Sequence, residues 1–251
     1  MGIKQILLSV VAMCGIVGAG AKPATEVVAH RGYWKAEGSA QNSVASLKKA
    51  IEIGARGSEC DVYITTDGVV VVHHDPTIDG KRIDESTYAA LKDCKLSNGE
   101  AIPTLDELLA IARKQKHTKL IIEIKSHNTQ EKEAAAVDAV LKLVKKNKMD
   151  KLVEYISFSQ NVCERLIALS PKAKVAYLGS DLTPKQLSDK GYTGLDYHIG
   201  AMRAHEEWFD EAKQLGLEVN VWTVDDEPNM KWLIGKGVTY ITTDEPVMLQ
   251  K

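Results

Sequence analysis

Cysteine is scarce in this chain, with four among 251 residues. Cys14 lies in the N-terminal segment, and the other three, Cys60, Cys94 and Cys163, are far apart and form no CxxC pair. An odd number of widely spaced cysteines indicates neither a disulfide framework nor a structural zinc site. We therefore expect these three side chains to be buried or partly buried free thiols.

Neither sign of charge is in large excess, since the net charge is only -2 and the lysines and arginines are scattered among acids. Proteins that bind nucleic acid usually carry a clustered basic surface, so we expect no nucleic acid partner and favour a small substrate. With 44% hydrophobic and 26% charged residues, the composition is that of a globular protein rather than a disordered or fibrous one. One soluble domain is expected.

The N-terminal apolar run, residues 6–17, is shorter than the about 20 residues that a membrane span requires. Lys4 precedes it and the small residues of 19–21 follow it, which is typical of a secretory signal. We expect a signal peptide at residues 1–21, cleaved after Ala21, a mature domain at 22–251 without a membrane span, and a secreted or periplasmic location.

Two other readings of this N-terminal segment are weaker. A short membrane anchor is disfavoured by the length of the apolar run. A lipoprotein acylated on Cys14 is disfavoured because Met13 is larger than the residue that usually precedes such a cysteine.

Short β-branched runs alternate with segments of helical spacing, which predicts repeated βα units around a parallel sheet. Eight such strands in a chain near ~250 residues fit a closed (β/α)8 TIM barrel. A doubly wound open sheet is the alternative, but no GxGxxG or phosphate-loop motif follows the first run. The predicted strands are 26–29, 57–63, 119–124, 153–158, 174–178, 194–197, 217–222 and 239–242.

Helix start and stop signals support this count of elements, since several helices begin at a capping residue and end at glycine. After the second strand, the Asp67-Gly68 turn signal and the run 69–72 predict a hairpin followed by a small insertion at 76–102. The predicted helices are 43–53, 104–114, 130–147, 159–169, 183–190, 204–215 and 228–236.

The carboxyl ends of barrel strands carry the active site, so polar residues at those ends are candidates. His30 and Arg31 end the first strand. Glu59 and Asp61 are two residues apart and share one face of the second strand, where a magnesium or calcium ion would remove their repulsion. The simpler interpretation is a pair of solvent-facing acids on an edge strand.

Two more strand ends carry charged or titratable residues. Glu123 would complete a three-carboxylate metal site, and Lys125 on the same face would hold a phosphate oxygen, although a plain Glu123–Lys125 ion pair is the alternative. In the doublet His73-His74, only one side chain can face the site, and the pattern alone does not say which. Histidines from two strand ends beside acids suit general acid-base cleavage of a phosphodiester.

These motifs resemble those of glycerophosphodiester phosphodiesterases across nearly all of the chain after residue 21. The resemblance rests on eight pieces: His30-Arg31-Gly32, Asn42-Ser43, Gly54-Ala55, Glu59-Cys60-Asp61-Val62, Thr66-Asp67-Gly68, His74-Asp75, Glu123-Ile124-Lys125 and Val221-Trp222-Thr223.

The resemblance implies a TIM barrel with a small insertion after the second strand, and it assigns a role to each matching residue. It implies His30 and His74 as catalytic acid and base, and it places His73 at a usually apolar position. The remaining implied roles are metal ligation by Glu59, Asp61 and Glu123, phosphate contact by Arg31 and Lys125, and contact of Trp222 with the glycerol moiety. Trp222 would otherwise be ordinary barrel filling.

The expected activity is hydrolysis of a glycerophosphodiester to sn-glycerol 3-phosphate and an alcohol with one divalent cation, Mg²⁺ or Ca²⁺. The family commonly has Glu where this chain has Gln41, so any charge that orients a histidine from there is missing. Two other functions remain: a lyase of the phospholipase D type that acts on lipid headgroup diesters, and a binding protein without catalysis. Paired proton carriers argue against the latter.

Overall fold

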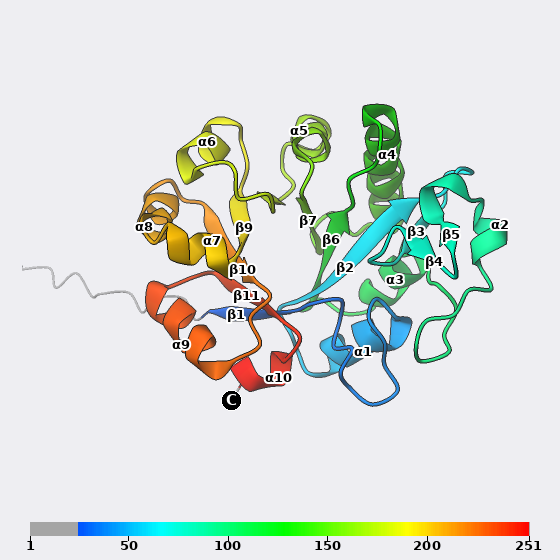
Figure 1. Cartoon of the computed structure of the whole chain (residues 1–251), viewed down its shortest axis with the longest axis horizontal. Coiled ribbons are helices and arrows are strands. Elements are labelled where there is room, and N and C mark those ends of the chain that lie inside the picture. Colours follow the sequence, from blue (N-terminus) through cyan, green and yellow to red (C-terminus); the bar gives the residue numbers. More distant parts are fainter. Residues whose placement is uncertain (1–24, 251) are drawn as a thin grey trace, which may run out of the picture.

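Eight parallel strands form the centre of the molecule, as the alternation of short apolar runs predicted (Figure 1). The computed structural model describes residues 25–250, so the expected signal peptide, its cleavage point and Cys14 lie outside the described residues. Each strand lies within one or two residues of its predicted bounds. The strands are β1 (Glu26–Ala29), β2 (Gly57–Ile64), β6 (Lys119–Ile124), β7 (Val153–Ser157), β8 (Val175–Tyr177), β9 (Gly194–His198), β10 (Glu218–Trp222) and β11 (Tyr240–Thr243).

The sheet closes because β1 pairs with strands on both sides. Its register with β11 runs from Glu26 opposite Tyr240 to Ala29 opposite Thr243, and its register with β2 places Val28 opposite Gly57. The remaining strands follow one another in chain order around the ring, all of them parallel. The predicted (β/α)8 TIM barrel is therefore confirmed, and the open doubly wound sheet is excluded.

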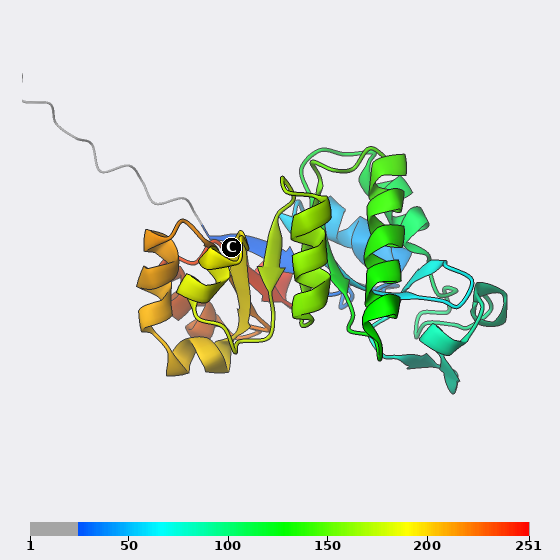
Figure 2. The ribbon, with the colours of Figure 1, turned by 90° about the horizontal axis from the view of Figure 1, so that it is seen from above.

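Helices surround the barrel, and several begin where a hydroxyl side chain caps the first turn. Thr104 and Thr183 form complete capping boxes with Glu107 and Gln186. Figure 2 shows α4 and α5 against the outside of the barrel. The helices are α1 (Val44–Glu52), α3 (Leu105–Ala112), α4 (Gln130–Lys146), α5 (Gln160–Leu169), α6 (Pro184–Asp189), α7 (Ile199–Ala204), α8 (Glu207–Gln214), α9 (Glu227–Lys236) and α10 (Pro246–Leu249).

The predicted single helix at 204–215 is wrong at its start, and α10 was not predicted. The chain forms α7 and then α8, separated at His205, whose φ of -133° and ψ of 62° end the first helix. The His205 ring stacks on Trp208, with ring centroids 4.1 Å apart. The stacked pair lies at the break between the two helices.

The predicted hairpin and insertion follow β2. Strand β3 (Val70–Val72) pairs antiparallel with β2, and the insertion contains β4 (Thr77–Ile78), β5 (Lys81–Arg82), the 3-10 helix η1 (Ile83–Glu85) and α2 (Tyr88–Leu91). A separate cluster that includes Val71, Ile83, Leu91 and Ile102 forms its core. The insertion lies beside the end of the barrel toward which the strand arrows point (Figure 2).

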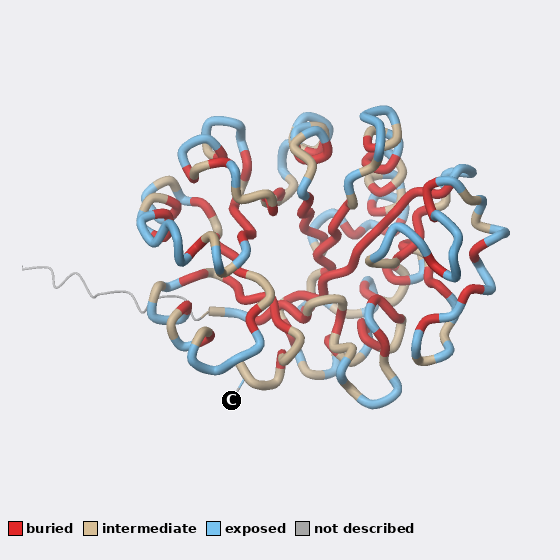
Figure 3. The backbone as a smooth tube through the Cα atoms, in the orientation of Figure 1, coloured by how far each residue is buried: buried red, intermediate tan, exposed pale blue. Residues whose placement is uncertain are grey.

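Alternation along the strands decides which side chains pack under the helices and which face the barrel interior. On β2, Cys60 and Val62 belong to the main core, whereas Glu59 and Asp61 occupy the opposite face. Figure 3 shows that the barrel strands are buried along most of their length. Cys60, Cys94 and Cys163 are buried free thiols, as expected. Among residues 25–250, no helix is long and apolar enough to cross a membrane.

Candidate active site

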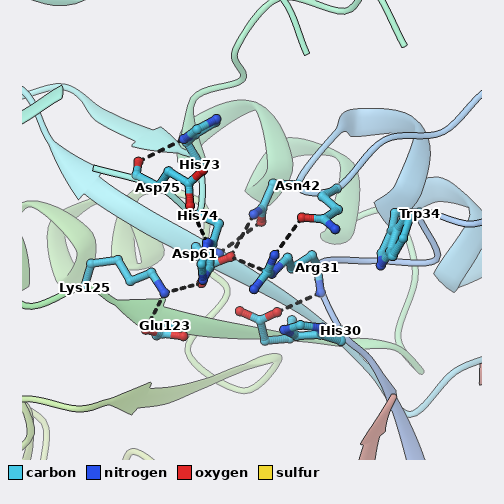
Figure 4. Close-up of polar contacts among 12 residues, drawn as sticks. His30, Arg31, Trp34, Asn42, Asp61, His73, His74, Asp75, Glu123 and Lys125 are labelled. Carbon is cyan, nitrogen blue, oxygen red and sulfur yellow. Dashed lines mark hydrogen bonds and ion pairs between the residues drawn. The ribbon is translucent and has the colours of Figure 1, made fainter. Parts of the chain in front are cut away.

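A tight turn after β1 presents His30 and Arg31 at the carboxyl end of the barrel (Figure 4). Arg31 has a φ of 54° and Gly32 a φ of 75°, both in the left-handed region. The backbone N–H of Arg31 donates a hydrogen bond to Glu59 Oε2 at 2.7 Å. The turn thereby joins the first strand to the carboxylates of the second.

Asp244, which follows β11, orients His30. Its Oδ1 lies 2.8 Å from His30 Nδ1 and also accepts a hydrogen bond from Trp34 Nε1 at 2.8 Å. Burial alone would raise the pKa of Asp244, but these contacts hold it below its usual value. The carboxylate therefore stays charged beside the imidazole.

Three buried carboxylates lie together on the inner face of β2 and β6. Glu59, Asp61 and Glu123 are 3%, 1% and 8% exposed, and each offers an oxygen within 4.8 Å of the others. Glu59 Oε1 is buried and has no hydrogen-bond partner among the described residues. The solvent-facing interpretation of Glu59 and Asp61 is therefore wrong, and the donor set suits a hard divalent cation.

The electrostatics of this cluster are unequal. Burial and the charges of Asp61 and Glu123 raise the pKa of Glu59 well above its usual value, and burial and Asp61 raise the pKa of Glu123 to about 8. Burial acts the same way on Asp61, but Lys125 and Asn42 lower its pKa to about 2. One permanent carboxylate is thus flanked by two that resist ionisation without a further cation.

Lys125 and Arg31 are the cations beside the carboxylates. Lys125 Nζ lies 2.8 Å from both Asp61 Oδ1 and Glu123 Oε1, so the ion pair considered from the sequence is present and extends to Asp61. Burial alone would lower the pKa of Lys125, but the two carboxylates raise it. Arg31 Nε lies 3.6 Å from Asp61 Oδ2, and Asn42 Nδ2 donates to the same oxygen at 2.8 Å.

Gln41 lies beside Arg31. Its Oε1 accepts a hydrogen bond from Arg31 Nη1 at 2.6 Å. The sequence had raised the question of whether this position orients a histidine. In the structure its hydrogen bond goes to the guanidinium, so a neutral amide here affects the placement of Arg31.

His74 and His73 point to different places. His74 lines one pocket together with His30, and its Nδ1 lies 2.7 Å from Asp75 Oδ1. Burial and the charge of Lys125 lower the pKa of His74. His73 Nδ1 instead lies 2.9 Å from the backbone oxygen of Asp75, on the side away from Lys125 (Figure 4).

The pocket contains seven of the eight residues singled out from the sequence, and Asp61 lies buried beneath it, bonded to Lys125. Its other wall is apolar: Trp222 packs edge-on against Phe158, with centroids 5.7 Å apart, and Phe158 is 44% exposed. The pocket is lined by His30, Arg31, Glu59, His74, Glu123, Lys125, Ile156, Phe158, Leu178, Asp196, Trp222 and Thr242.

Sequence reasoning missed Asp244, Phe158 and Asp196. Asp244 follows the eighth strand directly, so the strand-end argument that found His30 would also have found it. Phe158 is the last residue of its predicted strand, and at that position the pattern indicates a core residue. Asp196 interrupts the apolar run at 194–197 and is a signal of the same kind.

The site lies at the carboxyl end of a closed barrel and combines cations, carboxylates and two histidines. These features define the class of the protein as a TIM-barrel enzyme suited to phosphate esters. Residues 30–248 match the glycerophosphoryl diester phosphodiesterase family, so the chain belongs to this family. It is accordingly a phosphoric diester hydrolase.

Relatives of known structure or curated name are similar over most of their length. A glycerophosphodiester phosphodiesterase of Parabacteroides distasonis is 50% identical with a TM-score of 0.89, covering 90% of this chain and 95% of that one. One from Caldanaerobacter subterraneus subsp. tengcongensis is 29% identical, covering 90% of this chain and 96% of the relative. An Oleispira antarctica phosphodiesterase, solved with its product sn-glycerol-3-phosphate, is 25% identical with a TM-score of 0.76, covering 90% and 96%.

Proposed function

We propose that the protein hydrolyses glycerophosphodiesters to sn-glycerol 3-phosphate and an alcohol. The observation that carries this proposal is one pocket in which His30 and His74, each bonded to a carboxylate through Nδ1, face Arg31 and Lys125. Membership of the family supports the substrate class. So does the product held by the Oleispira antarctica relative.

Glu59, Asp61 and Glu123 would hold one divalent cation, Mg²⁺ or Ca²⁺. The partnerless Glu59 Oε1 and the raised pKa values of Glu59 and Glu123 fit this assignment, because a cation relieves both. When bound, the ion supplies positive charge against the phosphate oxygens. The same three carboxylates and water suit either ion.

His30 and His74 carry the protons. Because Nδ1 of each ring is occupied by a carboxylate, Nε2 is the atom available to the substrate. One ring accepts a proton from the nucleophile and the other donates one to the leaving alcohol. Asp244 bonds Nδ1 of His30 and Asp75 bonds Nδ1 of His74, which fixes the orientation of each ring.

Arg31 and Lys125 bind the phosphate. The guanidinium, held by Gln41, offers a planar pair of donors, and the ammonium acts as a compact charge. Trp222 forms the apolar wall against which the glycerol carbons pack. Together these contacts place the diester between the two histidines.

We also propose that residues 1–21 direct export and that the mature chain starts at Lys22, as the short apolar run with its small-residue end indicates. N-terminal sequencing of the protein from a periplasmic or culture-medium fraction tests this. A mature protein that retains Lys4, or that carries lipid on Cys14, would contradict it.

A substrate panel after chelation tests the proposed activity. We expect the purified protein to release sn-glycerol 3-phosphate from glycerophosphocholine or glycerophosphoethanolamine, to lose this activity in EDTA, and to regain it with Mg²⁺ or Ca²⁺. Intact sphingomyelin serves as the contrasting substrate. Cleavage of sphingomyelin alone would favour the lipid-headgroup lyase, and tight binding without turnover in either ion would favour the binding protein.

A further inference from the structure

Asp196 lies in the middle of β9 and faces the inside of the barrel. Its neighbours Leu195 and Tyr197 belong to the core under the helices, so the alternation of the strand places Asp196 on the opposite face. Across the sheet it is paired with Asn220 of β10. The residue is 2% exposed.

This carboxylate belongs to the floor of the active-site pocket. Asp196 and Ile156 are the two residues that line both this pocket and a second cavity deeper in the barrel. Trp222 Nε1 donates a hydrogen bond to the backbone oxygen of Asp196 at 2.9 Å. The apolar wall is therefore attached to the residue that carries the carboxylate.

Within the part of the chain that the structure describes, no cation neutralises Asp196. Its Oδ1 is buried without a hydrogen-bond partner, and it forms no ion pair within residues 25–250. Glu154, a comparably buried acid, is bonded to Arg56 Nη2 at 2.9 Å and Lys119 Nζ at 2.7 Å. Burial raises the pKa of Asp196 to about 7, opposed by the amide of Asn220.

An acid in this condition weakens the fold, because a buried polar group without a partner costs stability. Such groups are few in folded proteins, and a bound ligand is one way in which the missing partner is supplied. In the ionised carboxylate this unpartnered oxygen is an acceptor, so the missing group is a hydrogen-bond donor. Asp196 lines the pocket together with Trp222 and Phe158, the two aromatic residues that would pack against the carbon atoms of a ligand.

We propose that Asp196 is a specificity-determining residue that accepts a hydrogen bond from a hydroxyl of the substrate's glycerol moiety. This inference rests on the proposed function, since it assumes a glycerophosphodiester in the pocket. A substrate hydroxyl gives the buried oxygen its partner, whereas a diester without that hydroxyl leaves the oxygen unpaired. Sites built to bind a hydroxyl reject the analogue that lacks it.

Two variants and two diesters test the proposal. Asp196→Ala removes the acceptor, and Asp196→Asn keeps the size and one acceptor oxygen. The substrates are glyceryl p-nitrophenyl phosphate and ethyl p-nitrophenyl phosphate, which differ in the hydroxyls. We expect kcat/KM of Asp196→Ala to fall about 10- to 100-fold on the glyceryl ester and less than about 3-fold on the ethyl ester, with a smaller loss for Asp196→Asn.

Inhibition by the product gives a second measurement, which does not depend on turnover of the ethyl ester. We expect inhibition by sn-glycerol 3-phosphate to weaken in both variants by a factor similar to the loss of kcat/KM. Inhibition by inorganic phosphate, which has no glycerol, should stay within about 2-fold of the parent value, because phosphate binding depends on Arg31 and Lys125.

Controls separate a specific contact from a structural role. Asp189→Asn, at the exposed end of α6 where Asp189 pairs with Lys185, should leave both substrates unaffected. Thermal unfolding of the Asp196 variants should occur at the parent temperature or above it, because the change removes a buried acid.

An equal loss on both esters and both inhibitors, or no loss at all, would overturn the role of Asp196. The proposed function would stand in either case, provided the parent enzyme releases sn-glycerol 3-phosphate. Failure of the parent enzyme on every glycerophosphodiester is the different result that rejects the proposed function itself.

Discussion

At the scale of single residues, neighbouring carboxylates decide the orientation of the two candidate proton carriers. Asp244 directly follows the last strand of the barrel and Asp75 directly follows His74, yet each bonds an imidazole through Nδ1. His73, one position earlier, bonds a backbone oxygen instead. Two adjacent histidines thus have different surroundings, and their substitutions should differ accordingly.

Alanine substitutions at the histidines test this difference. His30→Ala and His74→Ala should each lower kcat for glycerophosphocholine by about 10²- to 10⁴-fold, the usual effect of losing a general acid or base. His73→Ala is the matched control and should lose less than about 3-fold. Release of sn-glycerol 3-phosphate gives the rates, and equal losses at positions 73 and 74 would contradict the assignment.

The choice between these two histidines was beyond local sequence reasoning. Strand alternation said that one of the pair faces the site, and the family resemblance selected His74. The backbone N–H of His73 donates a hydrogen bond to the backbone oxygen of Asp61 at 3.0 Å. This contact attaches the doublet to β2. That contact joins residues separated by a turn, and no periodicity shows it.

At the scale of elements, the turn between β1 and α1 sets the geometry of the site. Gly32 has a φ of 75°, and a Cβ at this position would lie 2.3 Å from Ser46 Oγ and 2.7 Å from the backbone of Ser46. Ser46 Oγ in turn donates to the backbone oxygen of Arg31 at 3.0 Å. The packing of this turn against α1 therefore requires glycine.

Gly32→Ala should destabilise the protein by more than the roughly 1 kcal/mol that a left-handed alanine costs, because Ser46 must also move. Gly38→Ala is the matched control, with a φ of 76° and nothing within 4 Å of the added Cβ. Thermal unfolding compares the two. We also expect a lower kcat/KM in Gly32→Ala alone, and equal effects of both changes would contradict the steric argument.

Elements were predicted well wherever their signals are local. The capped helices and all eight barrel strands follow from periodicity and end residues. The helix at 204–215 was wrong at its start, because the chain leaves helical geometry at His205, between α7 and α8, and the periodicity of 204–215 does not show this break. The small elements of the insertion, only two to four residues each, carry too few residues for a period to be visible.

At the scale of the whole molecule, the acid cluster makes stability depend on pH and on bound cation. The pKa of Glu123 is raised from 4.5 to about 8 in the folded protein. Its favourable contribution is therefore complete below about pH 4.5 and is lost as the pH rises through about 8. Glu59 is shifted in the same direction.

The metal-free protein should accordingly unfold at a lower temperature at pH 8.5 than at pH 6, and saturating Mg²⁺ or Ca²⁺ should restore several degrees at the higher pH. Glu123→Gln removes one of the ionising groups and should flatten this pH dependence in EDTA. Thermal melts with and without ion give the comparison. An unfolding temperature insensitive to both ions at pH 8.5 would speak against the metal site.

The sequence by itself determined the barrel and the residues at its strand ends, because alternation, capping and turn residues act over a few neighbours. Tertiary structure decided what those residues touch. It joined Asp244 to His30 across the closure between β1 and β11, turned Gln41 toward Arg31, and left Asp196 Oδ1 without a hydrogen-bond partner among residues 25–250. These outcomes depend on the closure and register of the sheet, which bring distant parts of the chain together.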